Sequence, residues 1–359
     1  MNQNTFLDRF PIPRYLKIPA LGLDISDRSL KYVELEKKNG AMSVSRFGQR
    51  LIPDGIIERG EIKDRTRIPQ VLASFKEEIK TDNIIVSLPE EKAFLIQITV
   101  PAINADKIKS VLELQIEEYV PLKAEEIIFD YTVLKIDEQV ITLNVTAYPS
   151  ALIYSYRDAF KEAGFMVIAF EMEMQAAARA VVPIDDQHTS LIIDFGKTRT
   201  TLAIMDEGQV KFASTIAIAG EGLTQALVNS LKIDIFRAET LKKERGFTKS
   251  KGNEAAFDAL LPAVSSIKDE VQKHLLYWDS HAQGMGGSAH KISKIILSGG
   301  ESNLQGLPEY FSYELKIPAE KANPWINIVS FESHIPEIEL DEALLYTTAI
   351  GLAMRGLSL

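Results

Sequence analysis

Two stretches of the chain, residues 21–35 and 191–205, share one pattern of apolar and polar positions. In the second stretch an apolar run leads into Asp194, a tight Phe195-Gly196 turn and a short polar segment follow, and another apolar run leaves. This pattern predicts a β-hairpin whose turn carries one carboxylate and several hydrogen-bond donors. Backbone N–H groups in such a turn suit a phosphate, and the carboxylate suits its metal ion.

The first stretch has the same outline. Asp24 aligns with Asp194, Ser26 aligns with Gly196, and the following strand is entered through Lys31. Two copies of one phosphate hairpin, far apart in the chain, predict two related domains that face a nucleotide between them.

In the rest of the chain, segments whose apolar residues repeat every 3.6 residues, as in helices, alternate with segments whose apolar residues repeat every 2 residues, as in strands. Helices are predicted over residues 68–79, 106–118, 150–163, 175–181, 220–231, 235–245, 255–282, 304–315 and 341–354. Further strands are predicted over residues 42–51, 83–88, 94–100, 127–136, 140–148, 167–170, 210–217 and 292–297, with a weaker strand pattern over 326–329. An Asn39-Gly40 hairpin turn and a flexible GMGGS segment complete the pattern. Strands that alternate with helices, together with strand triplets, predict an α/β protein with mixed sheets.

The order of these elements also predicts the domains. Residues 90–164 have the order strand, helix, strand, strand, helix, which predicts a small inserted α+β subdomain. The first large domain is expected to combine residues 21–89, 165–186 and 338–359, and the second to cover residues 187–337. The proline-containing residues 1–20 are interpreted as an extended N-terminal arm.

Composition narrows the possible functions. The net charge is −10 and the pI is about 5.2, which argues against non-specific nucleic-acid binding through a basic surface. There is no cysteine, so disulfides and thiolate metal sites are excluded. No apolar run has the length of a membrane span. The five histidines show no metal-binding spacing, and Tyr277-Trp278 is expected to be core.

Three segments resemble the nucleotide-binding signature of the actin-like ATPase superfamily. Asp24–Lys31 resembles the first phosphate loop, Asp194–Thr200 the second, and Leu297–Leu307 the adenosine loop. Each segment alone is weak, since glycine turns after strands are common, but their order and spacing form a joint signal. The resemblance implies an actin-like ATPase fold, with two related domains around a nucleotide cleft, and binding of ATP with Mg²⁺.

Within this superfamily the chain resembles the PilM family of type IV pilus assembly. The resemblance extends from about Leu21 onward. Its main carriers are GLDISDRSLKYVEL, IPDGIIERGEIKD, NIIVSLP, LQIEEYVP, FDYTVL, FEMEMQAAARA, LIIDFGKTRTTL, IAIAGEGLTQAL and LSGGESNLQGL. The inserted subdomain has the place of the small domain that PilM shares with the division protein FtsA. The segment LQIEEYVP is the most specific, because a generic ATPase has no need of it.

The resemblance and the residue chemistry assign roles to individual side chains. Asp24 and Asp194 are expected to face each other and hold Mg²⁺ through waters, and Asp194 is also assigned to catalysis. The other residues expected to contact the nucleotide are Ser26, Ser29, Lys31, Gly196, Lys197, Thr198, Glu239, Lys242, Lys243, Gly299 and Gly300. Solvated charges on an exposed helix face are an equal alternative for Glu239, Lys242 and Lys243.

Two further residues have open alternatives. Glu173 could orient the attacking water, or it could form a capping or inter-domain hydrogen bond. Tyr119, with Glu117 beside it, could contact a partner peptide that adds to the edge strand 94–100, or it could pack only in the subdomain core.

The first phosphate loop departs from the DIG pattern of the family, because Ser26 replaces the glycine and Asp27 follows it. A Cβ at this turn and an acid beside a triphosphate predict weaker nucleotide affinity or slower hydrolysis. Lys197 and Arg28 could offset the added negative charge.

The resemblance implies a nucleotide-binding scaffold, cytoplasmic and peripheral to the inner membrane. The expected partner is the cytoplasmic tail of a PilN-like protein, in a groove between the first domain and the inserted one. Other platform proteins and motor ATPases are further candidate partners. Whether the protein hydrolyses ATP stays open. The alternatives are a nucleotide-free relative from a type II secretion-like platform and a sugar-kinase-like phosphotransferase.

Overall fold

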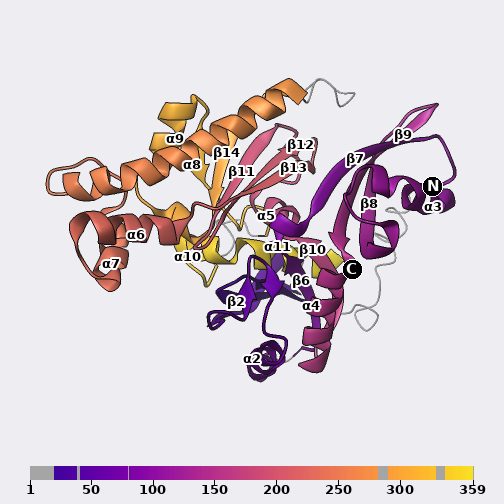
Figure 1. The fold of residues 1–359 in the computed structure, drawn as a ribbon, viewed down its shortest axis with the longest axis horizontal. Coiled ribbons are helices and arrows are strands. Elements are labelled where there is room, and N and C mark those ends of the chain that lie inside the picture. The colour runs from indigo at the N-terminus through magenta and orange to yellow at the C-terminus, as the bar shows by residue number, and fades with distance from the viewer. Residues whose placement is uncertain (1–19, 39–40, 80, 282–289, 329–335, 359) are drawn as a thin grey trace.

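A computed structural model describes residues 20–38, 41–79, 81–281, 290–328 and 336–358. The predicted N-terminal arm (except Ala20), the Asn39-Gly40 turn and the GMGGS segment lie outside these residues. The described chain forms two five-stranded sheets with helices on their faces and a third, smaller sheet at one side (Figure 1).

The first sheet joins two separate parts of the chain. Its strand order is β10 (Met166–Met172), β6 (Asn83–Leu88), β1 (Leu21–Ile25), β2 (Ser29–Lys38) and β3 (Ala41–Leu51). Strands β1, β2 and β3 form an antiparallel meander, whereas β6 runs parallel to both β1 and β10. The short pair β4 (Ile57–Glu58) and β5 (Glu61–Ile62) follows β3.

The second sheet repeats this order. It contains β13 (Gln209–Ile216), β12 (Thr200–Asp206), β11 (Ser190–Phe195), β14 (Lys294–Ser298) and β15 (Ala319–Lys321). Here β11, β12 and β13 form the antiparallel meander, and β14 runs parallel to both β11 and β15. Each hairpin predicted from the sequence therefore starts the same five-stranded arrangement, and the expected pair of related domains is confirmed.

Two helices pack between the sheets, α5 (Glu173–Val181) and α11 (Thr347–Ser358) (Figure 1). Their apolar side chains share one buried cluster with residues of β2, β11, β12 and β14. The two helices approach closely at Gly351, where a Cβ would lie 1.8 Å from the Ala176 carbonyl oxygen. A glycine is therefore required at this contact between the helices.

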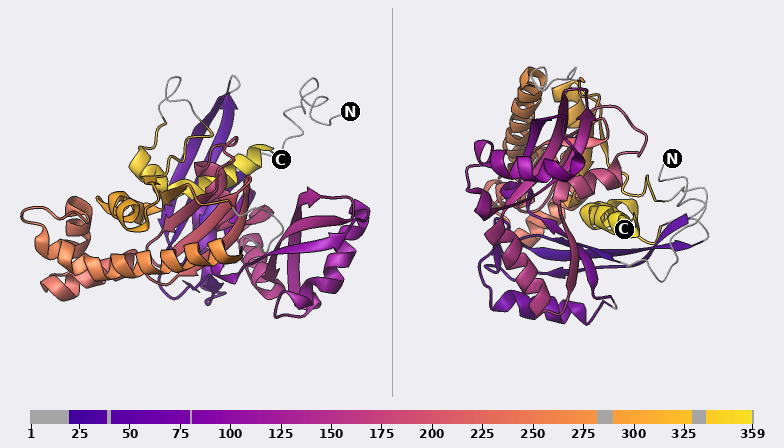
Figure 2. Two further views of the ribbon diagram at one scale, coloured as in Figure 1. Left: turned by 90° about the horizontal axis from the view of Figure 1, so that it is seen from above. Right: turned by 90° about the vertical axis from the view of Figure 1, so that its right-hand side faces the viewer.

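Other helices cover the outer faces. On the first sheet these are α2 (Arg67–Lys76) and α4 (Ser150–Glu162). On the second sheet they are α6 (Gly220–Leu231), α8 (Glu254–His281) and α9 (Leu307–Leu315), and α7 (Ile235–Arg245) packs beside α6 and α8. Figure 2 shows α8 running along the second domain.

The third sheet, with strand order β7–β9–β8, forms the inserted subdomain. Its strands are β7 (Phe94–Pro101), β8 (Ile127–Ile136) and β9 (Val140–Pro149), and it protrudes from the two-domain body (Figure 2). Helix α3 (Ala105–Gln115) packs on it and continues into the 3₁₀ turn Ile116–Glu118. Helix α4, expected to belong to this subdomain, instead buries its apolar face in the core of the first domain.

Most predicted elements form within a few residues of their predicted ends, with four differences. The weak strand pattern over 326–329 is wrong for its described part, because residues 326–328 form turns beside buried Trp325. Strand β15 and the short pair β4–β5 were not predicted. The helix predicted over 341–354 is divided into α10 (Leu340–Ala343), a 3₁₀ turn and α11. Helix α9 begins at Leu307, because Gly306 has a φ of +84° that a helix cannot include.

Candidate functional site

The first hairpin holds Asp24 at the end of β1. Asp24 lies opposite Lys31 in the antiparallel register, and the Lys31 Nζ is 3.6 Å from Asp24 Oδ2. Ser87, at the end of β6, donates a hydrogen bond of 2.9 Å to Asp24 Oδ1 and accepts one of 3.0 Å from the Ile25 N–H. Asp24 is 8% exposed. These contacts fix its carboxyl group at the mouth of the first turn.

The second hairpin repeats this arrangement at Asp194. Asp194 lies beside Ser298 of the parallel strand β14, as Asp24 lies beside Ser87 of β6. Opposite it on β12 is Thr201. The duplication therefore includes the third strand and its serine, which the two hairpin sequences alone did not indicate.

The two aspartates influence each other across the cleft. Burial raises the pKa of Asp194 to about 6, and the negative charge of Asp24 adds to this, while Lys31 and Arg199 act against it. Two carboxylates that repel each other, one buried and one partly buried, favour a divalent cation between them. In the described part of the chain, no group of three or more acidic, histidine or cysteine side chains could hold a metal. The pair fits Mg²⁺ that keeps most of its waters.

Arg199 lies between the two turns, and no pattern in the sequence indicated a role for it. It follows Thr198 in the second turn, and its Nη2 lies 2.6 Å from the Glu173 carboxylate on α5. Its Nη1 lies 3.6 Å from Asp27 of the first turn and 3.5 Å from Glu91. One guanidinium of the second domain therefore faces three carboxylates of the opposite side of the cleft.

Glu173 is the first residue of α5 and is buried. Burial raises its pKa to about 7; Arg199 acts against this, whereas Asp24 and Asp194 raise it further. A carboxyl group with this pKa near the two aspartates has the right chemistry to act on a water. The alternative weighed from the sequence, an inter-domain bond, is also present as the ion pair with Arg199.

Ser26 closes the first turn with its own side chain. The Ser26 N–H donates to the Ser29 carbonyl oxygen (2.9 Å), and the Ser26 hydroxyl accepts from the Ser29 N–H at 3.2 Å. Ser26 is not one of the described non-glycine residues with a positive φ. The turn therefore holds a Cβ without backbone strain. At the equivalent Gly196, a Cβ would lie 2.9 Å from the Arg199 carbonyl oxygen, so the second turn has less room.

The charges after Ser26 point away from the turn. The Asp27 carboxylate accepts hydrogen bonds from the Arg59 N–H (3.0 Å) and the Gly60 N–H (2.9 Å). Arg28 pairs with Asp54 and lies 3.4 Å from Glu221 on α6. Much of the charge that Asp27 was expected to present to a phosphate is therefore directed to the β4–β5 turn.

The three charged residues of α7 that were expected to contact the nucleotide lie in different environments. Lys242 is buried, and its Nζ donates to Thr224 Oγ1 (2.9 Å) and pairs with Glu301 at 2.9 Å. Glu239 accepts a 2.7 Å hydrogen bond from Thr224 and is half-exposed. Lys243 is exposed. A solvated surface role is therefore wrong for Lys242, whose ammonium group ties α7 to the adenosine loop.

The glycines of the adenosine loop are packed against protein. Gly299 has a φ of +84°, and a Cβ there would lie 2.5 Å from the Phe195 carbonyl oxygen and 2.8 Å from Asp194 Oδ1. A Cβ on Gly300 would lie 2.4 Å from Leu345. Gly299 thus brings this loop against the second phosphate turn, where Lys197 is exposed and Thr198 half-buried.

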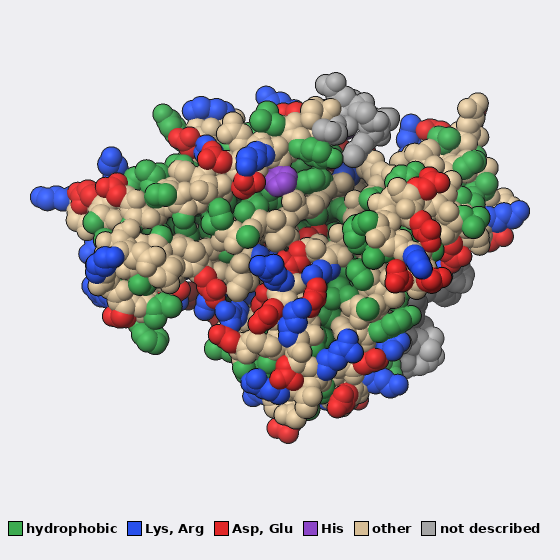
Figure 3. All heavy atoms as spheres, viewed as in Figure 1, with side chains coloured by type: hydrophobic (Ala, Val, Ile, Leu, Met, Phe, Trp, Pro, Cys, Tyr) green, Lys and Arg blue, Asp and Glu red, His purple; other side chains and the backbone are tan. Residues whose placement is uncertain are grey.

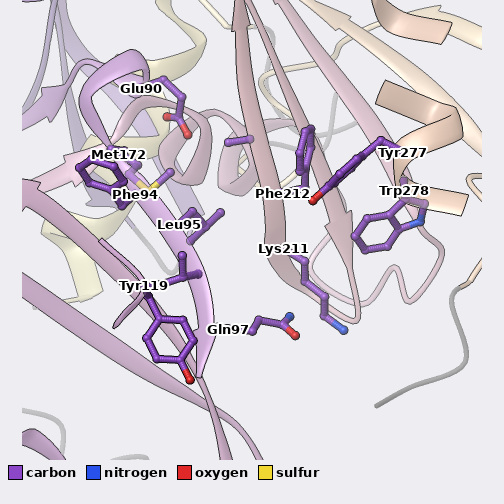
Figure 4. A pocket seen from close by; sticks show the side chains of 13 residues that line it. Glu90, Phe94, Leu95, Gln97, Tyr119, Met172, Lys211, Phe212, Tyr277 and Trp278 are labelled. Atoms are coloured by element: carbon purple, nitrogen blue, oxygen red, sulfur yellow. The ribbon is translucent and has the colours of Figure 1, made fainter. Parts of the chain in front are cut away.

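A groove of about 440 Å³ lies apart from this cleft, beside the inserted subdomain (Figure 4). One wall is the edge strand β7 with Tyr119, and the other is the edge strand β13 with Tyr277 and Trp278 of α8. The sequence predicts a partner groove between the first domain and the inserted one; in the groove described here, the second domain supplies the wall opposite β7. Tyr277 is 45% exposed and only Trp278 belongs to the core, so the expectation for this pair is half wrong.

The two predicted partner-binding residues differ in their positions. Tyr119 is 44% exposed and lines the groove, so its aromatic ring does not serve the core alone. Glu117 does not line the groove, and its carboxylate accepts a 2.7 Å hydrogen bond from the Ala124 N–H. The role of Glu117 in this structure is to hold the turn after α3.

A comparison with models of known protein families identifies the family of this chain. The model of a family described as "Type IV pilus assembly protein PilM" matches residues 22–357. The chain belongs to the PilM family.

Solved structures agree with this fold. A PilM chain from a "PilM-PilN type IV pilus biogenesis complex" is similar with a TM-score of 0.77 and 21% identity, covering 95% of this chain and 99% of that one. MreB5 of Spiroplasma citri bound to ADP is similar with a TM-score of 0.54 and 16% identity, covering 93% and 98%. The ethanolamine utilization protein EutJ from Carboxydothermus hydrogenoformans is similar with a TM-score of 0.54 and 15% identity, covering 98% and 96%. The fold is therefore actin-like.

The surface of this PilM-family chain mixes charges of both signs on the face shown in Figure 3. Within the described ranges, none of the helices has both the length and the apolar character needed to cross a membrane.

Proposed function

We propose that this PilM-family protein is a nucleotide-binding scaffold of type IV pilus assembly, cytoplasmic and peripheral to the inner membrane. It binds ATP with Mg²⁺ between Asp24 and Asp194, and it binds the cytoplasmic tail of a PilN-like inner-membrane protein in the groove beside β7. The partner supplies the attachment to the membrane.

Nucleotide binding, the first part of the proposal, is supported by the pair of equivalent turns. Each turn has an aspartate beside a serine of the parallel strand. Lys31 can neutralise phosphate charge around this pair, and Ser29 and backbone N–H groups of the two turns can donate hydrogen bonds to phosphate oxygens. When bound, Mg²⁺ neutralises phosphate charge. Glu173 positions Arg199 through their ion pair, and burial excludes bulk water from both side chains.

The groove supports the second part of the proposal, binding of the partner's tail. Both β7 and β13 are edge strands of their sheets, so each has one edge without a neighbouring strand in that sheet. An extended peptide can add its backbone to such an edge and place alternate side chains in pockets. Phe94, Tyr119 and Phe212 supply apolar surface for those side chains. The PilM-PilN complex among the similar structures supports a partner of the PilN type.

The experiment is a pair of titrations on the purified full-length protein. A fluorescent peptide with the sequence of the cytoplasmic tail of the PilN-like protein from the same organism is titrated with the protein, and Mg-ATP binding is measured by calorimetry. Saturable 1:1 binding of both ligands is expected. Failure of either ligand to bind at millimolar concentration overturns that half of the proposal.

A further inference from the structure

Glu90 places a buried carboxyl group at one end of the groove. It begins the 3₁₀ turn Glu90–Lys92 that leads into β7, and it is 5% exposed. Its Oε2 accepts a 3.1 Å hydrogen bond from the Met174 N–H in the first turn of α5. Its Oε1 is buried and has no hydrogen-bond partner among the described residues. Figure 4 shows the carboxyl group directed into the space between Phe94 and Phe212.

A buried polar atom without a partner is unfavourable, because it has lost its hydrogen bonds to water and gained none in the protein. Such atoms are rare in native proteins, and each one calls for an explanation. The nucleotide cleft does not use Glu90, and the Met174 N–H occupies only one of its oxygens. A ligand that enters the groove can supply the missing partner.

We propose that Glu90 is a recognition subsite for one lysine or arginine side chain of the peptide that occupies the groove. This inference rests on the proposed function, because it takes the partner's extended tail as the occupant. The cationic group pairs with Glu90 Oε1, and the aliphatic stem of the side chain lies along the apolar wall.

The groove favours a cation over a neutral donor for two reasons. Its walls near Glu90 are apolar, with Phe94, Leu95 and Met172 on one side, and a long aliphatic stem can pack there while its charged end reaches an acid. The surroundings of Glu90 are also acidic, since Glu173 and Glu91 lie near it. Arg199 is the cation that faces this group, and it is already paired with both of these acids.

The state of Glu90 without a ligand gives the subsite a measurable signature. Burial raises the pKa of Glu90 to about 8; the Met174 N–H lowers it, the Glu173 carboxylate raises it and Arg199 lowers it. Tyr148 of β9 faces it from the inserted subdomain, and Lys211 of β13 lines the same groove. At pH 7 most of the free protein therefore carries a proton on Glu90. Pairing with a cation ionises the carboxyl group and releases that proton.

The test is calorimetric titration of the partner-tail peptide at pH 7 in buffers of different ionisation enthalpy. We expect release of close to one proton per peptide, and a binding constant that rises by up to roughly tenfold per pH unit between pH 6 and 8. Glu90→Gln should lower affinity by about tenfold and abolish the proton release. The glutamine keeps an oxygen for the Met174 N–H, and Glu118→Gln, an exposed acid of the same subdomain, is the matched control.

A peptide series identifies the pairing side chain. Each basic residue of the tail is replaced in turn by norleucine, and one replacement should weaken binding and stop proton release with the wild-type protein yet change nothing with Glu90→Gln. Because this series uses the wild-type protein, it also decides the question if Glu90→Gln does not fold. Binding without proton release, or release that persists in Glu90→Gln, overturns the subsite while leaving the groove. No binding of the unmodified peptide overturns the proposed partner and the subsite together.

Discussion

Arg199 of the second domain forms a buried ion pair with Glu173 of the first domain, with 2.6 Å between Nη2 and Oε1. Both side chains are about nine-tenths buried, at 11% and 8% exposed. The same guanidinium faces Asp27 of the first phosphate turn and Glu91, three residues before the start of β7. One side chain of the second domain thus contacts the first turn, helix α5 and the segment that leads to the groove.

The first prediction concerns this ion pair. Arg199→Ala leaves buried Glu173 without its cation, and breaking a buried pair in this way typically lowers the free energy of unfolding by about 3–5 kcal/mol. Urea unfolding at pH 7.5 should show a loss in this range. Arg157→Ala, which removes the partner of Asp158 on the surface of α4, is the matched control and should change stability by less than about 1 kcal/mol. Equal effects of the two substitutions would contradict the bridging role of Arg199.

The second prediction concerns Ser26. The sequence suggested that Ser26→Gly would tighten nucleotide binding, but the hydrogen bonds between Ser26 and Ser29 predict the reverse. Glycine removes the hydroxyl that closes the turn and adds backbone freedom. Affinity for Mg-ATP, measured by calorimetry, should stay unchanged or fall by a few-fold. Tighter binding by Ser26→Gly would show that the Cβ does hinder the ligand.

Interactions between residues close in sequence were predictable, and those between distant residues were not. The hairpins at Asp24 and Asp194 were predictable because each is a local pattern of apolar strands around a polar turn. The ion pair between Arg199 and Glu173 was not predictable, because Glu173 lies on another domain and no local sequence pattern indicates the contact. One signal was available: a second charged side chain, Arg199, stands in the same short phosphate turn as Lys197.

Packing across distant segments explains the other differences. Helix α4 was assigned to the inserted subdomain by its order in the chain, but its apolar face matches the first domain, where buried Tyr156 donates to the Gly60 carbonyl oxygen at 2.9 Å. Lys242 was interpretable as a surface lysine, because its partner Glu301 is far away in sequence. The groove position likewise depends on β13, which is distant from β7 in sequence.

The third prediction uses the pH dependence of stability. The pKa of Glu90 is raised in the folded protein to about 8 from an ordinary value of 4.5, so the folded state holds its proton more strongly than the unfolded state. This contribution to stability is fully present below pH 4.5 and is lost as the pH rises to 8, by roughly 1.4 kcal/mol per pH unit.

Glu90→Gln removes that dependence. The difference in unfolding free energy between Glu90→Gln and the wild-type protein should therefore move in favour of the variant from pH 5.5 to pH 8, as measured by urea titrations at several pH values. Other titrating groups cancel in the difference. A difference that is flat with pH would show that Glu90 is ionised in the folded protein at neutral pH.

The fourth prediction separates the groove from the fold. Tyr119→Ala removes a half-exposed ring from the groove wall. It should lower the affinity for the partner-tail peptide by about tenfold or more, where each tenfold corresponds to about 1.4 kcal/mol of binding free energy. Mg-ATP affinity and thermal stability should stay near those of the wild type. Tyr313→Ala, which removes another exposed tyrosine from α9, is the control and should leave peptide binding unchanged. Glu117→Lys is better avoided as a probe, since its carboxylate holds the Ala124 N–H.

The central claim is that Asp24 and Asp194 together bind nucleotide through Mg²⁺, and calorimetric titration of Mg-ATP into Asp194→Asn tests it most directly. Asparagine keeps the shape of the side chain and relieves its repulsion with Asp24, so the variant should fold at least as stably as the wild type. We expect measurable Mg-ATP binding by the wild type, its loss in EDTA, a decrease of a hundredfold or more in Asp194→Asn, and no change in Asp158→Asn on α4. Equal Mg-ATP affinity of a folded Asp194→Asn protein and the wild type would contradict the account.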